Sequence, residues 1–352
     1  MKRKSKDRIT YADILLARNR EEEEAHLRRY VASNPTDIPA YVRLGDILRR
    51  KGMIEEALRI HRSLLKPRLD SETKKRVLQA VIDDLSAVGK FKESLPYLKE
   101  MVTLSPKDSY YLNILAGVYE QSEMWKDAIA IRKKLGDRKT LACVYASYGR
   151  SLFKKGFMRE AIQNLNIALR MDVTSVPALL YMGDIKYSNG DIDGAVVLWR
   201  RIIQNASQFA FITFGRLENA YFEKKRYQDM IEIYESCLEM PGNIEAHRRL
   251  ADLYYKIGEK EKAIDTLLKA FETSRDGRIA YQLAELYKKE GDYKKTVEVM
   301  EDILIKVISG DVYKCSKCGS EFKEFHFRCE SCFGWMTLQG KMGRQEDRIY
   351  YL

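Results

Sequence analysis

The chain is poor in the residues on which catalytic and disulfide-stabilised proteins depend. Its 352 residues include four histidines, six cysteines, seven prolines and three tryptophans. No nucleophile elbow, phosphate-binding loop or glycine-rich dinucleotide turn occurs. No stretch approaches the roughly 20 consecutive apolar residues that a membrane-spanning helix needs. The sequence therefore argues against the common hydrolase, nucleotide-binding and integral-membrane classes.

The few histidines are scattered: His26, His61, His247 and His326. His61 and His247 fall at positions where helices pack together, so we expect satisfied imidazoles there and not catalytic bases. Two cysteines, Cys143 and Cys237, are isolated within helical segments. With no secretory signal peptide, a reducing compartment is expected. A non-enzymatic protein is the prediction.

Positive charge is concentrated near the N-terminus. The whole chain has 62 basic and 51 acidic residues, a net charge of +11, and residues 1–76 hold 20 basic against 12 acidic residues, or +8. The first residues form a basic run: Lys2, Arg3, Lys4, Lys6 and Arg8. Such an arm can contact an anionic lipid surface. Nucleic acid is not expected, because no recognition signature accompanies the run, and a solvated tail is the commonest role for one this short.

Four cysteines near the C-terminus form two C-x-x-C pairs, Cys315 with Cys318 and Cys329 with Cys332. Each such turn points two sulfurs inward, and two facing turns create a tetrahedral four-sulfur site. Gly319 follows the first pair where a left-handed conformation is needed, and Gly334 is expected to serve a similar turn. The spacing predicts a closed, structural metal site. Disulfides and a competing ligand role for His326 are the alternatives.

Zinc is the expected ion, although a four-sulfur site also admits iron. An iron-loaded site could pass electrons, and this is the one enzymatic alternative that the sequence supports. Iron-loaded protein would be red, whereas zinc-loaded protein would be colourless. Metal binding would contribute on the order of 10 kcal/mol to the folding of so small a segment.

Between residues 38 and 308 the sequence repeats itself with a period near 34. A bulky residue followed by a small one recurs at Leu44-Gly45, Tyr148-Gly149, Met182-Gly183, Leu250-Ala251 and Leu283-Ala284. A turn glycine follows each pair, at Gly52, Gly156, Gly190, Gly258 and Gly291, and then a small residue, at Ala57, Ala161, Ala195, Ala263 and Thr296. The pattern resembles the tetratricopeptide repeat, a pair of antiparallel helices. It predicts an all-α superhelical solenoid.

Small residues let the two helices of a repeat approach, and bulky partners four residues after the second small position fill the gap. These partners are Leu165, Trp199, Tyr234 and Leu267. We expect eight repeats beginning near residues 38, 75, 109, 142, 176, 211, 244 and 277. Three of them are degenerate, with Ser94, Glu123 and Met230 replacing favoured small residues.

The expected organisation has four parts. Residues 1–37 form a basic segment and capping helix, with Ala25 and Ala32 on the packing face. Residues 38–308 form the repeat array, 309–340 the zinc-ribbon or rubredoxin-type metal domain, and 341–352 a C-terminal tail.

The first helices of stacked repeats line a groove that commonly holds a partner segment. One row of inward positions carries acids: Asp46, Asp83, Asp184, Asp252 and Glu285. The next turn carries aromatics: Phe153, Tyr187, Phe222 and Tyr255. This lining suits a basic or aromatic peptide. The alternative is that the acids pair with neighbouring Lys and Arg while the aromatics pack between helices. A chaperone-tail clamp is not expected, since carboxylates occupy the row that would hold basic residues.

Repeats followed by a C-terminal cysteine pair of knuckles resemble the lipopolysaccharide assembly protein B family of Gram-negative bacteria. The resemblance covers roughly residues 38–340 and depends most on Tyr313–Gly319 and Phe327–Trp335. It identifies the four knuckle cysteines as metal ligands of a rubredoxin-type domain. It also implies a regulatory adaptor that helps the membrane protease FtsH degrade the deacetylase LpxC. A general repeat scaffold in another envelope or quality-control pathway is the alternative.

The resemblance further implies a place at the cytoplasmic face of the inner membrane. Well-known members of the family begin with a transmembrane helix, whereas this sequence begins with Met1 and its basic run. We expect contact with the membrane through that run or through partners.

Overall fold

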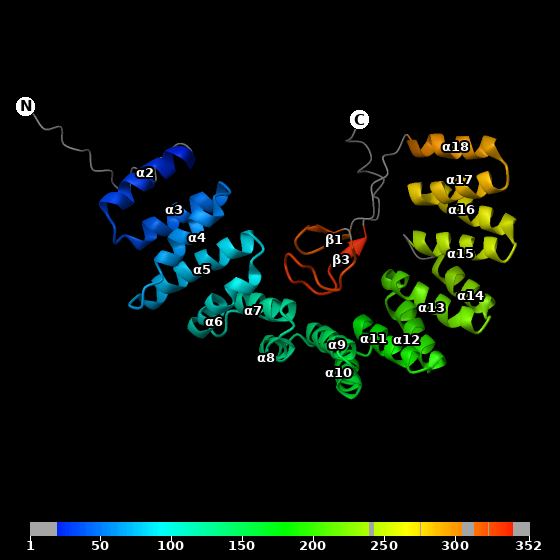
Figure 1. Cartoon of the computed structure of the whole chain (residues 1–352), viewed down its shortest axis with the longest axis horizontal. Coiled ribbons are helices and arrows are strands. Elements are labelled where there is room, and N and C mark those ends of the chain that lie inside the picture. Colours follow the sequence, from blue (N-terminus) through cyan, green and yellow to red (C-terminus); the bar gives the residue numbers. More distant parts are fainter. Residues whose placement is uncertain (1–19, 239–242, 275, 305–312, 323, 341–352) are drawn as a thin grey trace, which may run out of the picture. The chain divides into compact units, whose positions relative to one another are not determined.

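The computed structural model describes residues 20–238, 243–274, 276–304, 313–322 and 324–340 (Figure 1). Helices follow one another as far as Leu304, and a small three-stranded sheet comes after them. The chain divides into two compact units, Met1–Asp137 and Arg138–Leu352. Both are all-α in their repeat portions, as the sequence predicts.

The first unit contains α2 (Arg20–Ser33) and three antiparallel helix pairs. The pairs are α3 (Ile38–Arg50) with α4 (Ile54–Ser63), α5 (Ser71–Ala87) with η1 (Phe91–Ser94) and α6 (Leu95–Leu104), and α7 (Ser109–Gln121) with α8 (Trp125–Leu135).

The second unit contains five further pairs. They are α9 (Arg138–Lys154) with α10 (Met158–Met171), α11 (Val176–Ser188) with α12 (Ile192–Asn205), η2 (Ser207–Phe209) and α13 (Phe211–Glu223) with α14 (Tyr227–Leu238), α15 (Ile244–Lys256) with α16 (Lys260–Ser274), and α17 (Gly277–Lys289) with α18 (Tyr293–Leu304). The sheet consists of β1 (Tyr313–Cys315), β2 (Glu321–Phe322) and β3 (Leu338–Gly340), antiparallel in the order β2-β1-β3.

The helix pairs begin where the 34-residue pattern predicts, with two small differences. Six first helices start at the expected residue, while α5 and α9 start at 71 and 138, each four residues before the predicted 75 and 142. Local capping accounts for the first shift, because the Asp70 carboxylate accepts hydrogen bonds from the backbone N–H groups of Glu72 and Thr73. Gly136, left-handed at the end of α8, explains the second, since it ends one helix immediately before the next.

The close crossing inside each pair depends on matched small and large residues. A Cβ atom on Gly183 would lie 2.4 Å from Trp199 Nε1, and one on Gly149 would lie 2.9 Å from Leu165 Cγ. Trp199 and Leu165 are almost fully buried. The sequence prediction of small residues against bulky ones is therefore confirmed at these crossings.

Two repeats solve the same crossing with polar groups. In the first repeat the bulky partner of Gly45 is His61, which is fully buried. Its Nδ1 lies 2.6 Å from the buried carboxylate of Asp84, and its Nε2 lies 3.1 Å from a backbone carbonyl oxygen. In the α13–α14 repeat, Glu218 replaces the small residue and accepts a hydrogen bond from the Tyr234 hydroxyl. Both satisfied polar groups avoid the cost of unpaired burial.

The turn between the paired helices uses a left-handed residue in most repeats. The five expected glycines have φ between 80° and 90°. In two repeats that lack glycine, Glu123 and Lys225 adopt φ of 54° at the same place. The degenerate repeats therefore keep the turn geometry although a side chain there costs conformational energy.

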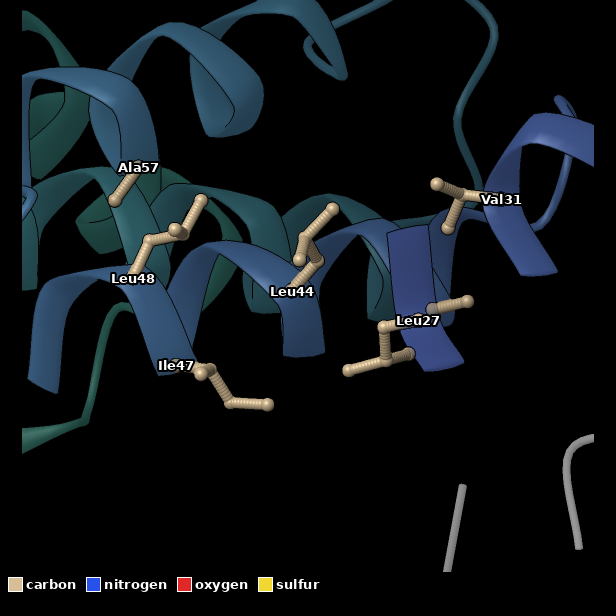
Figure 2. Close-up of a cluster of buried hydrophobic side chains, with 7 residues drawn as sticks. Leu27, Val31, Leu44, Ile47, Leu48 and Ala57 are labelled. Carbon is tan, nitrogen blue, oxygen red and sulfur yellow. The ribbon is translucent and has the colours of Figure 1, made fainter. Parts of the chain in front are cut away.

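The capping helix α2 packs through residues other than those predicted. Leu27 and Val31 are buried and join Leu44 and Leu48 of α3 in one apolar cluster (Figure 2). Ala25 and Ala32, the predicted packing residues, are exposed. The prediction was wrong because it searched for small residues, whereas an end helix without a close crossing buries its large aliphatic side chains.

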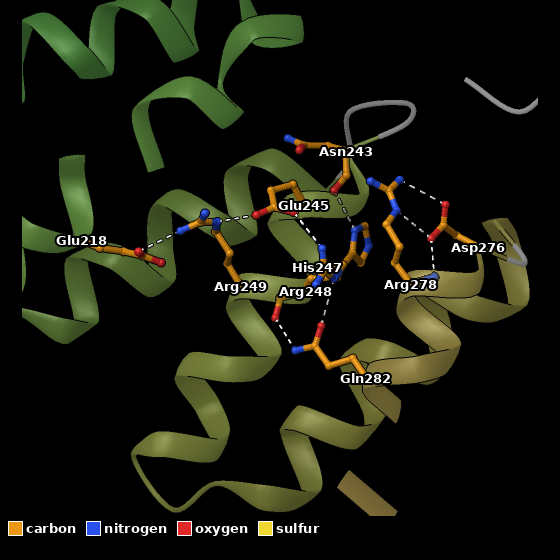
Figure 3. A network of polar contacts seen from close by, with 9 residues as sticks. All are labelled: Glu218, Asn243, Glu245, His247, Arg248, Arg249, Asp276, Arg278 and Gln282. Carbon is orange, nitrogen blue, oxygen red and sulfur yellow. Dashed lines mark hydrogen bonds and ion pairs between the residues drawn. The ribbon is translucent and has the colours of Figure 1, made fainter. Parts of the chain in front are cut away.

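Polar contacts also tie successive first helices of the second unit together. Arg249 of α15 pairs with Glu218 of α13 at 2.8 Å, and Arg248 donates to the side-chain oxygen of Gln282 on α17 at 3.2 Å (Figure 3). At the start of α17, Asp276 accepts a hydrogen bond from the Arg278 backbone and pairs with its guanidinium (Figure 3). These contacts connect neighbouring repeats around a common register.

Candidate metal centre and its docking on the repeats

The two C-x-x-C turns bring four sulfurs together in the second unit. The Cys315 and Cys332 sulfurs are 3.6 Å apart, and those of Cys318 and Cys329 are 3.7 Å apart. All four lie within 4.8 Å of one another and none is in a disulfide. Sulfurs about 2.3 Å from one tetrahedral ion would be separated by about 3.8 Å. The cluster therefore has the size and donor chemistry of a four-sulfur metal site.

Backbone geometry holds each turn in shape. Gly319 has φ of 77°, and its N–H donates to the Cys315 carbonyl at 2.9 Å. In the second turn the equivalent residue is Phe333, with φ of 59° and an N–H that donates to the Cys329 carbonyl at 3.0 Å. The expectation that Gly334 makes this turn was wrong. Gly334 is instead crowded, since a Cβ there would lie 2.8 Å from Thr337 Cγ2.

Two of the four thiols favour the thiolate. Burial opposes ionisation of Cys315, but the Thr337 hydroxyl at 3.1 Å and nearby backbone N–H groups lower the pKa of Cys315 to about 6. Burial likewise opposes ionisation of Cys318, and contacts with the Ser320 hydroxyl and backbone lower the pKa of Cys318 below its usual value.

The other two thiols favour the neutral form. Burial raises the pKa of Cys329, and burial together with the neighbouring sulfurs raises the pKa of Cys332 to about 12. Four sulfurs this close compete for negative charge, and a divalent cation would relieve that competition and hold all of them as thiolates. The donor set thus fits a metal ion, and either zinc or iron suits four sulfurs.

His326 lies outside this cluster. Its ring contacts Phe322 edge to face at 6.1 Å, and its Nε2 lies 4.0 Å from the Glu330 carboxylate. The four sulfurs come together without it. The competing ligand role considered from the sequence is therefore not supported.

The cysteine module, residues 313–340, packs on the array through aromatic rings. Three rings of the module meet three rings carried by α11, η2 and α13: Tyr313, Phe325 and Phe327 meet Tyr181, Phe209 and Phe211. Phe325 is central, with ring centroids 5.7 Å from Phe209 and 5.5 Å from Phe211. Such aromatic contacts each contribute roughly 0.5–1.5 kcal/mol beyond the area they bury. The module is thereby held against the first-helix side of two repeats.

These docking residues were missed from the sequence. The signal was present as two aromatic-rich stretches, 209–214 before and within α13 and 325–327 between the cysteine pairs. Both could equally have been core residues of their own elements. Only proximity in the fold distinguishes an interface from a core.

Each acid of the predicted groove row has a basic neighbour. The pairs are Asp46–Arg49 at 2.6 Å, Asp83–Arg49 at 4.0 Å, Asp184–Arg216 at 2.6 Å, Asp252–Lys256 at 3.0 Å and Glu285–Lys288 at 3.9 Å. Burial also raises the pKa of Asp83, against the effect of Arg49. The structure therefore shows the paired arrangement that the sequence left as the alternative, without testing whether a partner competes for these acids.

The predicted aromatic row is half-buried and engaged with its own array. The Tyr187 and Tyr255 hydroxyls donate to Glu223 at 3.1 Å and to Glu290 at 3.3 Å. The Phe222 ring lies 5.1 Å from that of Tyr227. Phe153 lines a small cavity of about 180 Å³ together with Tyr181 and Asp184. Phe153 and Asp184, one residue from each row, therefore meet at that cavity.

Comparison with known proteins defines the class first. Models of the tetratricopeptide repeat match residues 40–75, 177–208 and 221–286. The chain is thus a tetratricopeptide-repeat solenoid with a C-terminal cysteine cluster that could hold a metal ion. No helix in the part of the chain that the structure describes has the length and apolar character to cross a bilayer.

The particular resemblance is to lipopolysaccharide assembly protein B. The chain is 22% identical to that protein of Escherichia coli (strain K12) over 348 residues, 96% of this chain and 90% of the relative. It is 23% identical to the Haemophilus influenzae protein of that name over 312 residues, 85% of this chain and 78% of the relative. The resemblance inferred from the sequence is confirmed. Among solved structures, the tetratricopeptide-repeat protein YrrB matches with a TM-score of 0.34 at 19% identity, covering 49% of this chain and 88% of that chain.

Proposed function

We propose that the protein is a non-enzymatic adaptor in lipopolysaccharide assembly. The observation that carries this proposal is the resemblance to lipopolysaccharide assembly protein B along 96% of the chain, including the cysteine module. Repeat solenoids of this kind present long surfaces for other proteins. The described residues supply a scaffold with one closed sulfur site and no open ligand position for a substrate.

The metal site has an architectural role in this proposal. Cys315, Cys318, Cys329 and Cys332 would hold one zinc ion, which supplies the folding energy that the small module lacks. The aromatic contacts of Phe325 then hold the folded module against α13. A rigid module on a rigid array offers two surfaces at a constant separation. Binding one protein on each surface raises the effective concentration of one for the other.

The proposed partners are the protease FtsH and the deacetylase LpxC, with the adaptor promoting degradation of LpxC. This part of the proposal is supported by the resemblance. It places the protein at the cytoplasmic face of the inner membrane, with the basic run from Lys2 to Arg8 contributing peripheral contact to anionic lipid.

The groove row remains part of the proposal as a surface for a basic or aromatic segment. Asp252 is the most available acid of the row, because 58% of its side chain is exposed and its partner is one exposed lysine on the same helix. Exposed ion pairs of this type contribute little, so a basic partner could replace Lys256 at small cost. Reversing the charge of Asp184 and Asp252 should weaken capture of such a partner.

The adaptor is tested in a Gram-negative host that lacks its own copy of the protein. We expect the wild-type chain to co-purify FtsH and LpxC and to shorten the half-life of LpxC. Replacing the four cysteines with serine should abolish both effects, because the module would lose its fold. The matched control replaces Cys143 and Cys237, the buried cysteines outside the cluster, with alanine. A stable LpxC pool with wild-type protein present, or an unrelated set of captured partners, would favour a general repeat scaffold.

Metal identity is tested by the absorption spectrum and elemental analysis of protein purified under reducing conditions. Zinc-loaded protein is expected to be colourless, with one zinc per chain. A red protein containing iron would instead support the redox alternative.

A further inference from the structure

The first unit contains a cleft that the acid and aromatic rows do not describe. Its volume is about 390 Å³, and it is lined by residues of α2, α3 and α5. Aliphatic side chains form part of its wall, with Ile47 buried and Ile38 and Val42 half-buried. This size lies within the roughly 300–1,000 Å³ that is typical of ligand pockets.

The charges around the cleft do not balance. Its two acids are already neutralised, since Glu23 pairs with Arg43 at 2.5 Å and Asp46 pairs with Arg49 at 2.6 Å. Arg49 is held in turn by the buried carboxylate of Asp84 at 2.9 Å. The acids of the cleft therefore cannot compensate any further cation without giving up these partners.

Two lining arginines remain without strong partners. Arg76 of α5 lies 3.7 Å from Glu72 one turn away, and both side chains are about two-thirds exposed, 66% and 70%. Arg50, in the last turn of α3, forms no ion pair with any residue that the structure describes. An exposed pair of the Arg76 kind contributes little and is readily replaced. Arg50 and Arg76 thus present two available guanidinium groups beside an aliphatic wall.

We propose that this cleft binds an acidic peptide segment of a partner protein, with carboxylates on Arg50 and Arg76 and an aliphatic side chain against Val42 and Ile47. Guanidinium groups suit carboxylates because their planar donors can form two parallel hydrogen bonds. The aliphatic wall distinguishes this ligand from a nucleic-acid backbone, which has no apolar group to bury. A membrane surface is too flat to enter a concave site. The inference deepens the adaptor function proposed above and rests on it.

The proposal gives the two units opposite preferences. In the second unit the groove row at Asp184 and Asp252 is acidic and would favour a basic segment. In the cleft of the first unit the available charge is positive. Opposite charge requirements along one array would select a partner by the order of its charged segments.

Fluorescence anisotropy with the purified full chain tests the cleft. The probe is a fluorescein-labelled octapeptide of alternating glutamate and leucine. Three comparison ligands are a lysine–leucine octapeptide, a glutamate–glycine octapeptide and vesicles containing phosphatidylglycerol. We expect saturable binding of the glutamate–leucine probe, binding at least about tenfold weaker for the lysine and glycine versions, and a decrease with added salt.

Charge-reversal variants locate the binding. Arg50→Glu combined with Arg76→Glu should weaken binding of the probe by about tenfold or more. The matched control, Arg59→Glu with Arg68→Glu, makes the same change in net charge at exposed positions of the first unit outside the cleft. Val42→Ala should weaken the leucine-containing probe alone. Helical circular dichroism confirms that each variant is folded.

Several outcomes would overturn the cleft proposal: equal binding of the lysine probe, equal losses in the two double variants, or saturable binding only to vesicles. None of them would affect the adaptor function, which is judged by captured proteins and LpxC half-life. Conversely, a bound probe with no effect on LpxC would retain the cleft and reject the proposed pathway.

Discussion

The repeats and the cysteine module are stabilised in different ways. Each repeat buries large side chains at its crossing, as Trp199 does against Gly183, and passes apolar contact to the next repeat. The core of the module contains only Cys315, Cys329 and Leu338 as buried members. Stability is therefore distributed along the array, whereas in the module it is concentrated on the four sulfurs and on one aromatic interface. A local change should affect the two regions to very different degrees.

Metal removal should separate the regions most sharply. We expect a chelator, or Cys315→Ser with Cys329→Ser, to unfold the module, with a loss on the order of 10 kcal/mol of metal-linked stability. Helical circular dichroism should hardly change, because the array does not depend on the sulfurs. Limited proteolysis with mass spectrometry would then find new cleavages within residues 313–340. A module that stays protease-resistant without metal would contradict the comparison.

A large change in the array comes from the Trp199→Ala substitution. Trp199 is 1% exposed, so its truncation leaves a cavity at the crossing of α11 and α12 and should cost about 3–5 kcal/mol. Urea unfolding followed by helical circular dichroism measures the loss. The exposed Val197 on the same helix offers a control, since Val197→Ala should change stability by less than about 0.5 kcal/mol. Equal effects would show that the crossing does not hold the repeat.

Truncation of the docking ring tests whether the module and the array are coupled. Phe325→Ala should remove the contacts with Phe209 and Phe211 and cost about 2 kcal/mol, less than a fully buried ring because Phe325 is half-buried. Metal content should remain one ion per chain, while hydrogen exchange of α13 should increase. Loss of the metal in this variant would mean that docking is needed for the sulfur site to form.

A smaller effect is expected from a charged cap within the array. Burial alone would raise the pKa of Asp276, but hydrogen bonds from the side chain and backbone of Arg278 lower this pKa below its ordinary value of 3.8. A lowered pKa contributes stability that is present above the unfolded value and is lost as pH falls through the folded value. Asp276→Asn keeps the cap but removes the charge, and should cost roughly 0.5–1 kcal/mol at neutral pH.

Urea unfolding at pH 7 and at pH 2.5 checks the direction of that effect. The difference between the wild-type and the variant should shrink at the lower pH, where the aspartate is protonated. A difference that grows toward acid would show that the carboxylate is not held by Arg278.

Much of the array could be predicted because its pattern is local. A residue such as Gly183 faces its partner Trp199 within one helical hairpin, so the 34-residue period alone predicts which side chains meet. The C-x-x-C spacing similarly predicts which sulfurs share a turn. Predictions weakened where a position has more than one solution. Phe333 adopts the left-handed turn expected of Gly334, and α2 buries Leu27 instead of Ala25.

The amino-acid sequence by itself determined the repeat register, the helix pairs and the joining of four cysteines into two turns, because each depends on contacts between residues close in the chain. Only the tertiary structure decided that Phe325 docks on Phe211, that the predicted groove acids have basic neighbours, and that Arg50 and Arg76 share a cleft. These arrangements join residues from separate helices. Their side chains have several equally suitable partners until packing of the backbone leaves one within reach.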